Sequence, residues 1–261
     1  MSGVLSATLM VAGVGLFVGI FLSIASKAFA VPVDEKEQAI EEVLPGANCG
    51  ACGYSGCAAC AAAISKGAAP VNACVVGQQP VADQVAKIMG TTAAEEQRKV
   101  AFVRCVGDCE KTTETYEYHG PKHCVNVKMA PGGGPKSCTF GCIGCGDCAD
   151  VCDYDAMHIE KGVAVVTEAN CVDCKKCMKT CPKGLIIEVP FNYVSHIGCV
   201  NPNKGKSVMQ NCKIGCITCQ KCVRDCPSQA ITIVGGFPVI DYAKCTNCGI
   251  CKTGCPRKCI V

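Results

Sequence analysis

The chain has 261 residues, of which 28 are cysteine, and a content of roughly 11% is above the level at which composition indicates a disulfide or metal-binding framework. Tryptophan is absent and aromatic residues make up 5%, so large side chains contribute little to any core, which excludes an ordinary single-core enzyme. The net charge of +3 provides no broad basic surface, which argues against a nucleic-acid partner.

The N-terminal segment, residues 1–30, is predicted to be a transmembrane anchor. Residues 4–25 form a nearly unbroken apolar run of 22 residues, which would span about 33 Å as a helix. A cleaved signal peptide is the alternative, because Ala28, Phe29 and Ala30 resemble a cleavage site. The retained anchor is favoured, since no Lys or Arg precedes the apolar run and Lys27 follows it.

Residues 31–90 are predicted to form a small domain. A short amphipathic helix is expected at residues 34–44, ended by Pro45 and Gly46, and another at residues 81–89. Between them lies a C-x2-C-x4-C-x16-C pattern with several glycines, which allow tight turns around a group bound by the cysteines. The cysteines of this pattern are Cys49, Cys52, Cys57 and Cys74.

The connecting segment, residues 91–137, carries cysteines that lie outside any repeat. With the next cysteine along the chain they form a candidate set for an extra cluster: Cys105, Cys109, Cys124 and Cys138. The alternative is a structural role, because the offset between Cys138 and Cys212 is the one that relates the two downstream repeats, and Cys124 and Cys199 nearly share it. Cys60 and Cys259 are expected to be small buried residues or free thiols.

Two modules follow, at residues 138–190 and 191–261, and each contains the C-x2-C-x2-C-x3-C spacing twice, with the same separation between its two runs. Three thiolates of such a run hold one 4Fe-4S cluster, and the fourth cysteine belongs to the neighbouring cluster. Zinc sites and disulfides do not need runs this regular, and short strands are expected at residues 163–167 and 230–234. The predicted ligand sets are Cys142, Cys145, Cys148 and Cys181; Cys171, Cys174, Cys177 and Cys152; Cys216, Cys219, Cys222 and Cys255; and Cys245, Cys248, Cys251 and Cys226.

Residues 44–53 read Leu-Pro-Gly-Ala-Asn-Cys-Gly-Ala-Cys-Gly. This motif resembles the 4Fe-4S domain of the B subunit of Rnf-type electron-transport complexes and of certain corrinoid iron-sulfur proteins. The apolar segment, this domain and the two ferredoxin modules, in this order, are similar to the Rnf B subunit over nearly the whole chain. The resemblance implies an α+β chain in which the cysteines at 49, 52, 57 and 74 hold a fifth 4Fe-4S cluster.

Five clusters, and no recognisable nucleotide or flavin site, predict a chain that transfers single electrons and leaves bond chemistry to partners. The resemblance implies a subunit of an ion-translocating ferredoxin:NAD oxidoreductase. In it, reduced ferredoxin supplies the electrons, which pass to membrane subunits, while the whole complex reduces NAD and translocates ions. The expected location is the cell (inner) membrane, with one membrane pass and cytoplasmic cluster domains. Electrons are expected to arrive at the C-terminal module and to leave from the N-terminal one.

Two other functions remain open on the sequence. A polyferredoxin adaptor of a hydrogenase or of a redox-sensor reducing system would share every motif and differ only in its partners. An exported structural protein stabilised by zinc or disulfides would contain no inorganic sulfide.

Overall fold

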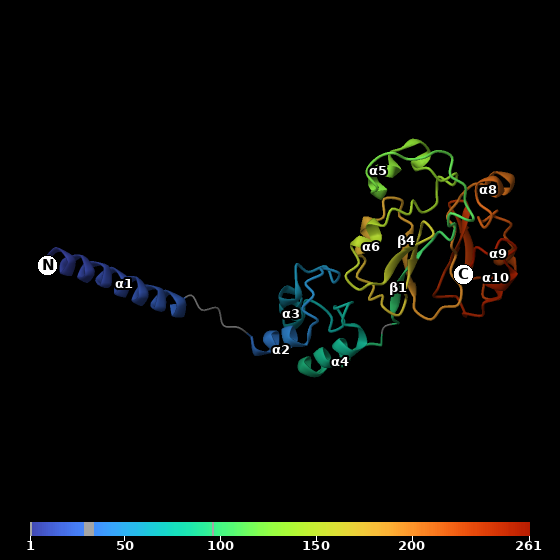
Figure 1. Cartoon of the computed structure of the whole chain (residues 1–261). Coiled ribbons are helices and arrows are strands. Elements are labelled where there is room, and N and C mark those ends of the chain that lie inside the picture. Colours follow the sequence, from blue (N-terminus) through green and yellow to red (C-terminus); the bar gives the residue numbers. More distant parts are fainter. Residues whose placement is uncertain (1, 29–33, 96) are drawn as a thin grey trace.

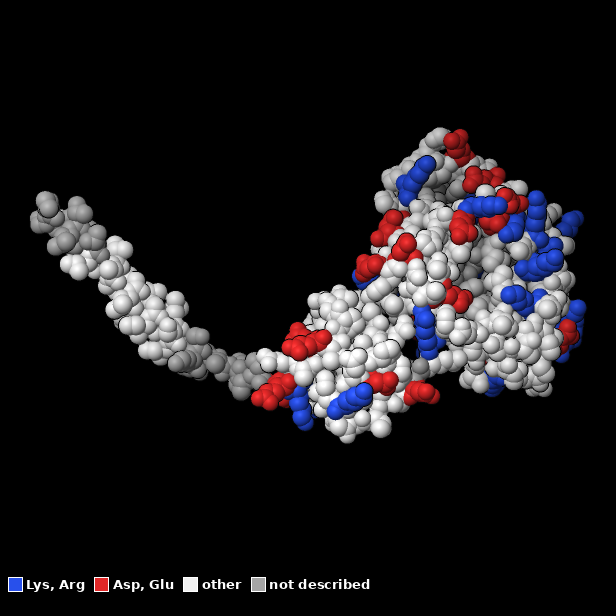
Figure 2. Space-filling view, turned by 60° about the horizontal axis from the view of Figure 1, so that its bottom comes forward, with Lys and Arg blue, Asp and Glu red and all other residues white. Residues whose placement is uncertain are grey.

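A computed structural model describes residues 2–28, 34–95 and 97–261. Its first element is helix α1 (Ser2–Ala28), seen at the N-terminal end of the chain in Figures 1 and 2. The described large apolar side chains of this helix, from Leu9 to Ile24, are exposed. Among the described residues, no helix combines the length and the apolar character that a membrane crossing needs. The anchor at residues 1–30 therefore stays a prediction, and Phe29 and Ala30 of the alternative cleavage site lie outside the described residues.

Three helices build the N-terminal domain, which lies between α1 and the rest of the chain in Figure 1. They are α2 (Glu35–Val43), α3 (Cys57–Ser65) and α4 (Gln78–Met89). The Asp34 carboxylate caps α2 by accepting the Lys36 N–H at 3.0 Å. The helix expected at residues 34–44 is confirmed to within one residue at each end. One fully buried aliphatic side chain from each helix, namely Ile40, Ile64 and Val85, packs into a common core.

Each ferredoxin module contains one antiparallel hairpin between its two cysteine runs. In the first module β2 (Met157–Glu160) pairs with β3 (Val163–Val166), and in the second β5 (Ile231–Val234) pairs with β6 (Phe237–Ile240). The strands expected at residues 163–167 and 230–234 are confirmed, with one boundary of each shifted by a single residue.

The connecting segment contributes a strand to the first module. Strand β1 (Lys99–Val103) pairs antiparallel with β4 (Ile186–Pro190), which follows the last cysteine of that module (Figure 1). The second module has a shorter equivalent, in which Ile197 forms an antiparallel bridge with Ile260. Both modules thus join the chain before their first cysteine run to the chain after their last one.

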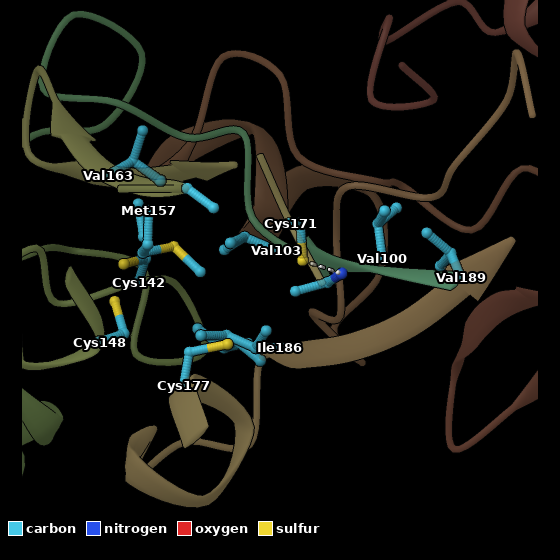
Figure 3. Packing of buried hydrophobic residues seen from close by; sticks show 14 residues of the cluster. Val100, Val103, Cys142, Cys148, Met157, Val163, Cys171, Cys177, Ile186 and Val189 are labelled. Carbon is cyan, nitrogen blue, oxygen red and sulfur yellow. Dashed lines mark hydrogen bonds between the residues drawn. The ribbon is translucent and has the colours of Figure 1, made fainter. Parts of the chain in front are cut away.

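Short helices surround these strands. Four of them begin just after the second cysteine of a run and carry its third cysteine: α6 (Asp147–Asp150), α7 (Lys176–Thr180), α9 (Lys221–Arg224) and α10 (Ile250–Gly254). The remaining ones are α5 (Cys124–Lys128), the 3-10 turn η1 (Pro131–Gly133) and α8 (Gly205–Asn211). Cysteines take up much of the small core, and in Figure 3 Cys142, Cys148, Cys171 and Cys177 lie among Val, Ile and Met side chains.

Candidate iron-sulfur sites

The four cysteine runs share a backbone feature at matching positions. In each run, the residue before the second cysteine and the residue after it both have positive φ. Such angles are uncommon outside glycine, so their repetition at eight positions shows that the four loops are equivalent and turn around their thiols in the same way. The first position holds Gly144 (φ 89°), Asp173 (54°), Thr218 (54°) and Asn247 (56°), and the second holds Gly146 (105°), Lys175 (63°), Gln220 (59°) and Gly249 (73°).

The second run of the first module brings its predicted set together. Cys152, Cys171, Cys174 and Cys177 all line one hollow of about 360 Å³. Burial, followed by the neighbouring thiols of Cys174, Cys171 and Cys152, raises the pKa of Cys177 to about 12. The N–H of Ala101 in β1 donates to Cys171 Sγ at 3.3 Å, as the dashed line in Figure 3 shows. Strand β1 therefore supplies a hydrogen bond to a candidate ligand that is distant in the sequence.

The first run of this module gathers one thiol more than predicted. One hollow of about 380 Å³ is lined by Cys142, Cys148 and Cys181 together with Cys124. Cys145 lies beside Cys124, and the Cys124 thiol is, after burial, the next cause of the raised pKa of Cys145. Burial also raises the pKa of Cys148 to about 12, with neighbouring thiols as the next causes. The Leu185 N–H lies 3.5 Å from Cys181 Sγ.

In the second module, one hollow of about 340 Å³ is lined by the predicted set Cys226, Cys245, Cys248 and Cys251. The backbone N–H groups of Ala230 and Asn247 each lie 3.4 Å from a sulfur of this set. Such N–H···S contacts orient thiolate ligands and tune the group that they hold.

The other set of this module also comes together. Burial raises the pKa of Cys222 to about 12, and the thiols of Cys216, Cys219 and Cys255 are the next contributors. Cys259, buried as expected, lies beside this set with its Sγ 3.7 Å from that of Cys255.

The N-terminal set is held at the start of α3. Asn48 Oδ1 accepts the Cys57 N–H at 2.8 Å, which fixes the loop that carries Cys49 and Cys52. Burial is the main cause of the raised pKa of Cys74, and the other three cysteines of the set add to it. The buried Cys60 lies against Cys52, and its pKa is raised to about 12, chiefly by burial.

Crowded thiols, several of them buried and with raised pKa values, suit a cofactor that brings positive charge. In the second module a hydrogen bond with the Cys259 thiol instead lowers the pKa of Cys216 to about 7 and that of Cys255 to about 5. Thiolates are the ligating form, and four of them in one buried site repel one another unless cationic iron lies between them. All 28 cysteines lie in the described part of the chain, and all are free of disulfides. Among the described residues, no group of three His, Cys, Asp or Glu side chains is placed to hold a metal ion. The predicted cysteine sets fit a polynuclear 4Fe-4S core instead, because such a core binds one thiolate at each of four corners.

The structure does not bring the candidate extra set together. Cys109 is exposed, Cys124 lines the hollow of the first run, and Cys105 and Cys138 line a separate hollow. Cys199 and Cys212, which had no predicted ligand role, share that separate hollow. In the sequence, the matching positions of Cys138 and Cys212 in the two repeats indicated two of the four cysteines that share this hollow.

Comparisons with known proteins agree with this chemistry. Residues 44–76 match the family described as "Putative Fe-S cluster", and residues 141–185 match the family described as "4Fe-4S dicluster domain". These matches cover the N-terminal cysteine set and the cysteine runs of the first module.

Three relatives are similar over almost the whole chain. The B subunit of the Na(+)-translocating ferredoxin:NAD(+) oxidoreductase complex of Acetobacterium woodii is 43% identical over 94% of this chain and 74% of its own length. The B subunit of the ion-translocating oxidoreductase complex of Methanosarcina acetivorans is 41% identical over 100% and 99%. The B subunit of the proton-translocating ferredoxin:NAD(+) oxidoreductase complex of Clostridium ljungdahlii is 36% identical over 93% and 87%. The chain therefore belongs to the family of B subunits of Rnf-type ion-translocating oxidoreductase complexes, and it is an electron-transfer subunit.

Proposed function

We propose that this chain holds five 4Fe-4S clusters and receives electrons from reduced ferredoxin for delivery to the membrane subunits of its complex. Two of the relatives are named as ferredoxin:NAD(+) oxidoreductase subunits, and NAD is the proposed final acceptor in the whole complex. When bound, 4Fe-4S clusters carry single electrons. The chain itself supplies thiolates, N–H···S contacts and a fixed order of sites.

The main support for this proposal is the equivalence of the four cysteine loops. Each loop carries three cysteines of one predicted set, and the fourth cysteine of that set comes from the other run of the same module. This crossed arrangement keeps the two centres of a module close together. The proposed ligands are the twenty cysteines of the five predicted sets.

The N-terminal set lies next to the first module. The pKa of Tyr154 is raised by burial first, and then by the thiols of Cys49 and Cys174, which belong to the two different sets. Lys176, whose ammonium pairs with the Asp153 carboxylate, also lies within the influence of both thiols. This contact supports transfer between the N-terminal domain and the first module.

The charge distribution supports arrival of electrons at the C-terminal module. Residues 191–261 carry nine Lys and Arg against two Asp and Glu, whereas residues 1–190 carry 16 and 20. In Figure 2 blue side chains gather on the side of the body where α8, α9 and α10 lie in Figure 1. An acidic ferredoxin would be attracted to this face.

The other end of the chain is proposed to meet the membrane. The apolar run of residues 4–25, together with the exposed apolar side chains between Leu9 and Ile24, supports a single-pass anchor in the cell membrane. The cluster domains would then lie in the cytoplasm, where ferredoxin is available. The N-terminal domain would be the part nearest to the membrane subunits.

The test of electron arrival uses the full-length protein with its clusters, purified without oxygen. Lys204 and Lys206 are exposed on the C-terminal module, and Lys66 is exposed on the N-terminal domain. The double variant Lys204→Glu/Lys206→Glu is expected to be reduced by ferredoxin about tenfold more slowly at low salt, and the control Lys66→Glu at the wild-type rate. Equal rates for all three proteins would refute arrival at this face.

A further inference from the structure

Four cysteines from distant parts of the chain line one hollow between the two ferredoxin modules. It contains about 400 Å³ of empty space, part of it open to solvent, and the hollows lined by cysteines of the predicted sets contain about 380, 360 and 340 Å³ in the same sense. We propose that the thiols of Cys105, Cys138, Cys199 and Cys212 hold a sixth 4Fe-4S cluster at this junction. The proposal extends the five-cluster assignment and rests on the same chemistry.

The two modules supply these thiols from equivalent positions. Cys138 and Cys212 each precede the first cysteine of their module's first run by four residues. Cys105 and Cys199 each directly follow a residue that pairs with the last segment of the module. The Arg104 N–H donates to Leu185 O, and the Gly198 N–H donates to Cys259 O, both at 2.8 Å.

These two hydrogen bonds are equivalent, because Leu185 and Cys259 each follow the last cysteine of their module's second run by four residues. Cys105 and Cys199 form an antiparallel bridge with each other, as two equivalent segments do when they meet across an approximate two-fold axis. Each module thus contributes the same pair of thiols to one shared site.

The surroundings of these sulfurs resemble those of a cluster ligand. The Cys216 N–H donates to Cys199 Sγ at 3.3 Å, and the Asn201 side-chain amide lies 3.6 Å from Cys138 Sγ. Glycine backbone lies close to the other two sulfurs: a Cβ on Gly107 would lie 3.3 Å from Cys212 Sγ, and one on Gly141 would lie 3.4 Å from Cys105 Sγ. Such close backbone approach is a use of glycine beside a bound group.

One buried lysine lines the hollow, and a half-buried lysine lies nearby. Lys136 lines it and is 8% exposed, and among the described residues it forms no ion pair with a carboxylate; its ammonium donates to Gly162 O at 2.5 Å. Lys183 donates to Thr139 O and Gly141 O, next to Cys138. Buried charges are normally paired, and a 4Fe-4S core with four thiolates, which carries about −2, would be the missing partner.

The site would connect the two modules. Cys105 packs against the core that contains Cys142, and its thiol adds to the burial that raises the pKa of Cys142. On the other side, Cys199 packs against the core that contains Cys216 and accepts its N–H. A one-electron carrier here would lie between the ligand set of Cys142 and that of Cys216.

The test measures iron and acid-labile sulfide in the full-length protein, purified without oxygen, with paramagnetic resonance on stepwise reduction. The wild type is expected to contain about 24 iron atoms, and Cys212→Ala about 20 with one resonance signal lost. Cys109→Ala is the matched control, because this exposed cysteine belongs to the alternative set, and it is expected to keep about 24. Cys138→Ala is expected to repeat the loss seen with Cys212→Ala.

Each other outcome has a definite meaning. About 20 iron atoms in both the wild type and Cys212→Ala would refute the sixth cluster and leave the five intact. Loss of iron in Cys109→Ala but not in Cys212→Ala would assign the cluster to the alternative set. One zinc ion, or a Cys105–Cys199 disulfide, would overturn the cluster at this site, whereas iron far below about 20 atoms in the wild type would refute the five-cluster assignment itself. If Cys212→Ala does not fold, Cys199→Ser with the same readouts decides.

Discussion

Gly144 is the position at which the structure predicts the sharpest difference between two similar substitutions. It lies between Cys142 and Cys145, has a φ of +89°, and a Cβ added to it would lie 2.2 Å from Gly162 O. Gly184 follows Cys181 in the same module and also has a positive φ, of +60°, but nothing lies within 4 Å of an added Cβ. Gly184→Ala is therefore the matched control for Gly144→Ala.

The cost of each change follows from its surroundings. An L-residue in the left-handed region costs about 1–2 kcal/mol, and this is the full expected effect of Gly184→Ala. In Gly144→Ala the turn at Gly162 must also move, which disturbs the bond from the buried Lys136 ammonium to Gly162 O. An unsatisfied buried donor adds about 1–3 kcal/mol, so the total for Gly144→Ala is about 2–5 kcal/mol.

The measurement is an anaerobic urea titration followed by the visible absorption of the clusters, together with iron content. Gly144→Ala is expected to unfold at clearly lower urea than Gly184→Ala and to lose about four iron atoms, because its loop carries three ligands of one set. Equal unfolding midpoints and full iron content in both variants would show that the loop does not have the conformation described.

Three further outcomes follow from single side chains. Lys136→Gln keeps a hydrogen-bond donor but removes a buried charge, so a potentiometric titration is expected to show one cluster with a midpoint potential lowered by about 40–90 mV; an unchanged set of potentials would contradict this. Gln220→Gly relieves a positive φ of 59° and is expected to raise the free energy of unfolding by about 0.5–1 kcal/mol, as measured by urea titration. Burial lowers the pKa of His196, so the unfolded chain binds more protons, and stability is expected to fall as the pH drops below about 6.5. In thermal unfolding, His196→Gln should have a weaker pH dependence than the wild type.

Much of the fold was predictable because the ligand spacing is a local property of the chain. Three cysteines within seven residues must share a loop, and the crossed fourth ligand follows from the repeat. The hairpins were predictable for the same reason, since residues 163–167 and 230–234 are short apolar runs between two such loops. Local sequence also indicated the helix capped by Asp34, although α4 begins at Gln78, three residues earlier than expected.

The shared site at the junction was not predictable from the sequence, because it depends on pairing between distant segments. Cys105 reaches it only because β1 pairs with β4, which lies beyond both cysteine runs of the first module. The connecting segments of the two modules also differ in length, since the stretch from Cys105 to Cys138 is more than twice as long as that from Cys199 to Cys212. The equivalence of Cys105 and Cys199 is therefore hidden in the spacing, and Cys124 falls near the offset between the repeats by coincidence.

The contacts between neighbouring sets give the proposed sites a linear order. Tyr154 joins the N-terminal set to the second run of the first module, and the junction site touches Cys142 on one side and Cys216 on the other. Without a cluster at the junction, the two modules would be two separate pairs of carriers. With it, every proposed site has a neighbour, and the basic module and the apolar N-terminal helix lie at opposite ends of the row. Under the proposed function, an acidic donor would meet the first end and membrane partners the second, and this arrangement supports the proposed electron flow from the second module toward the N-terminal domain.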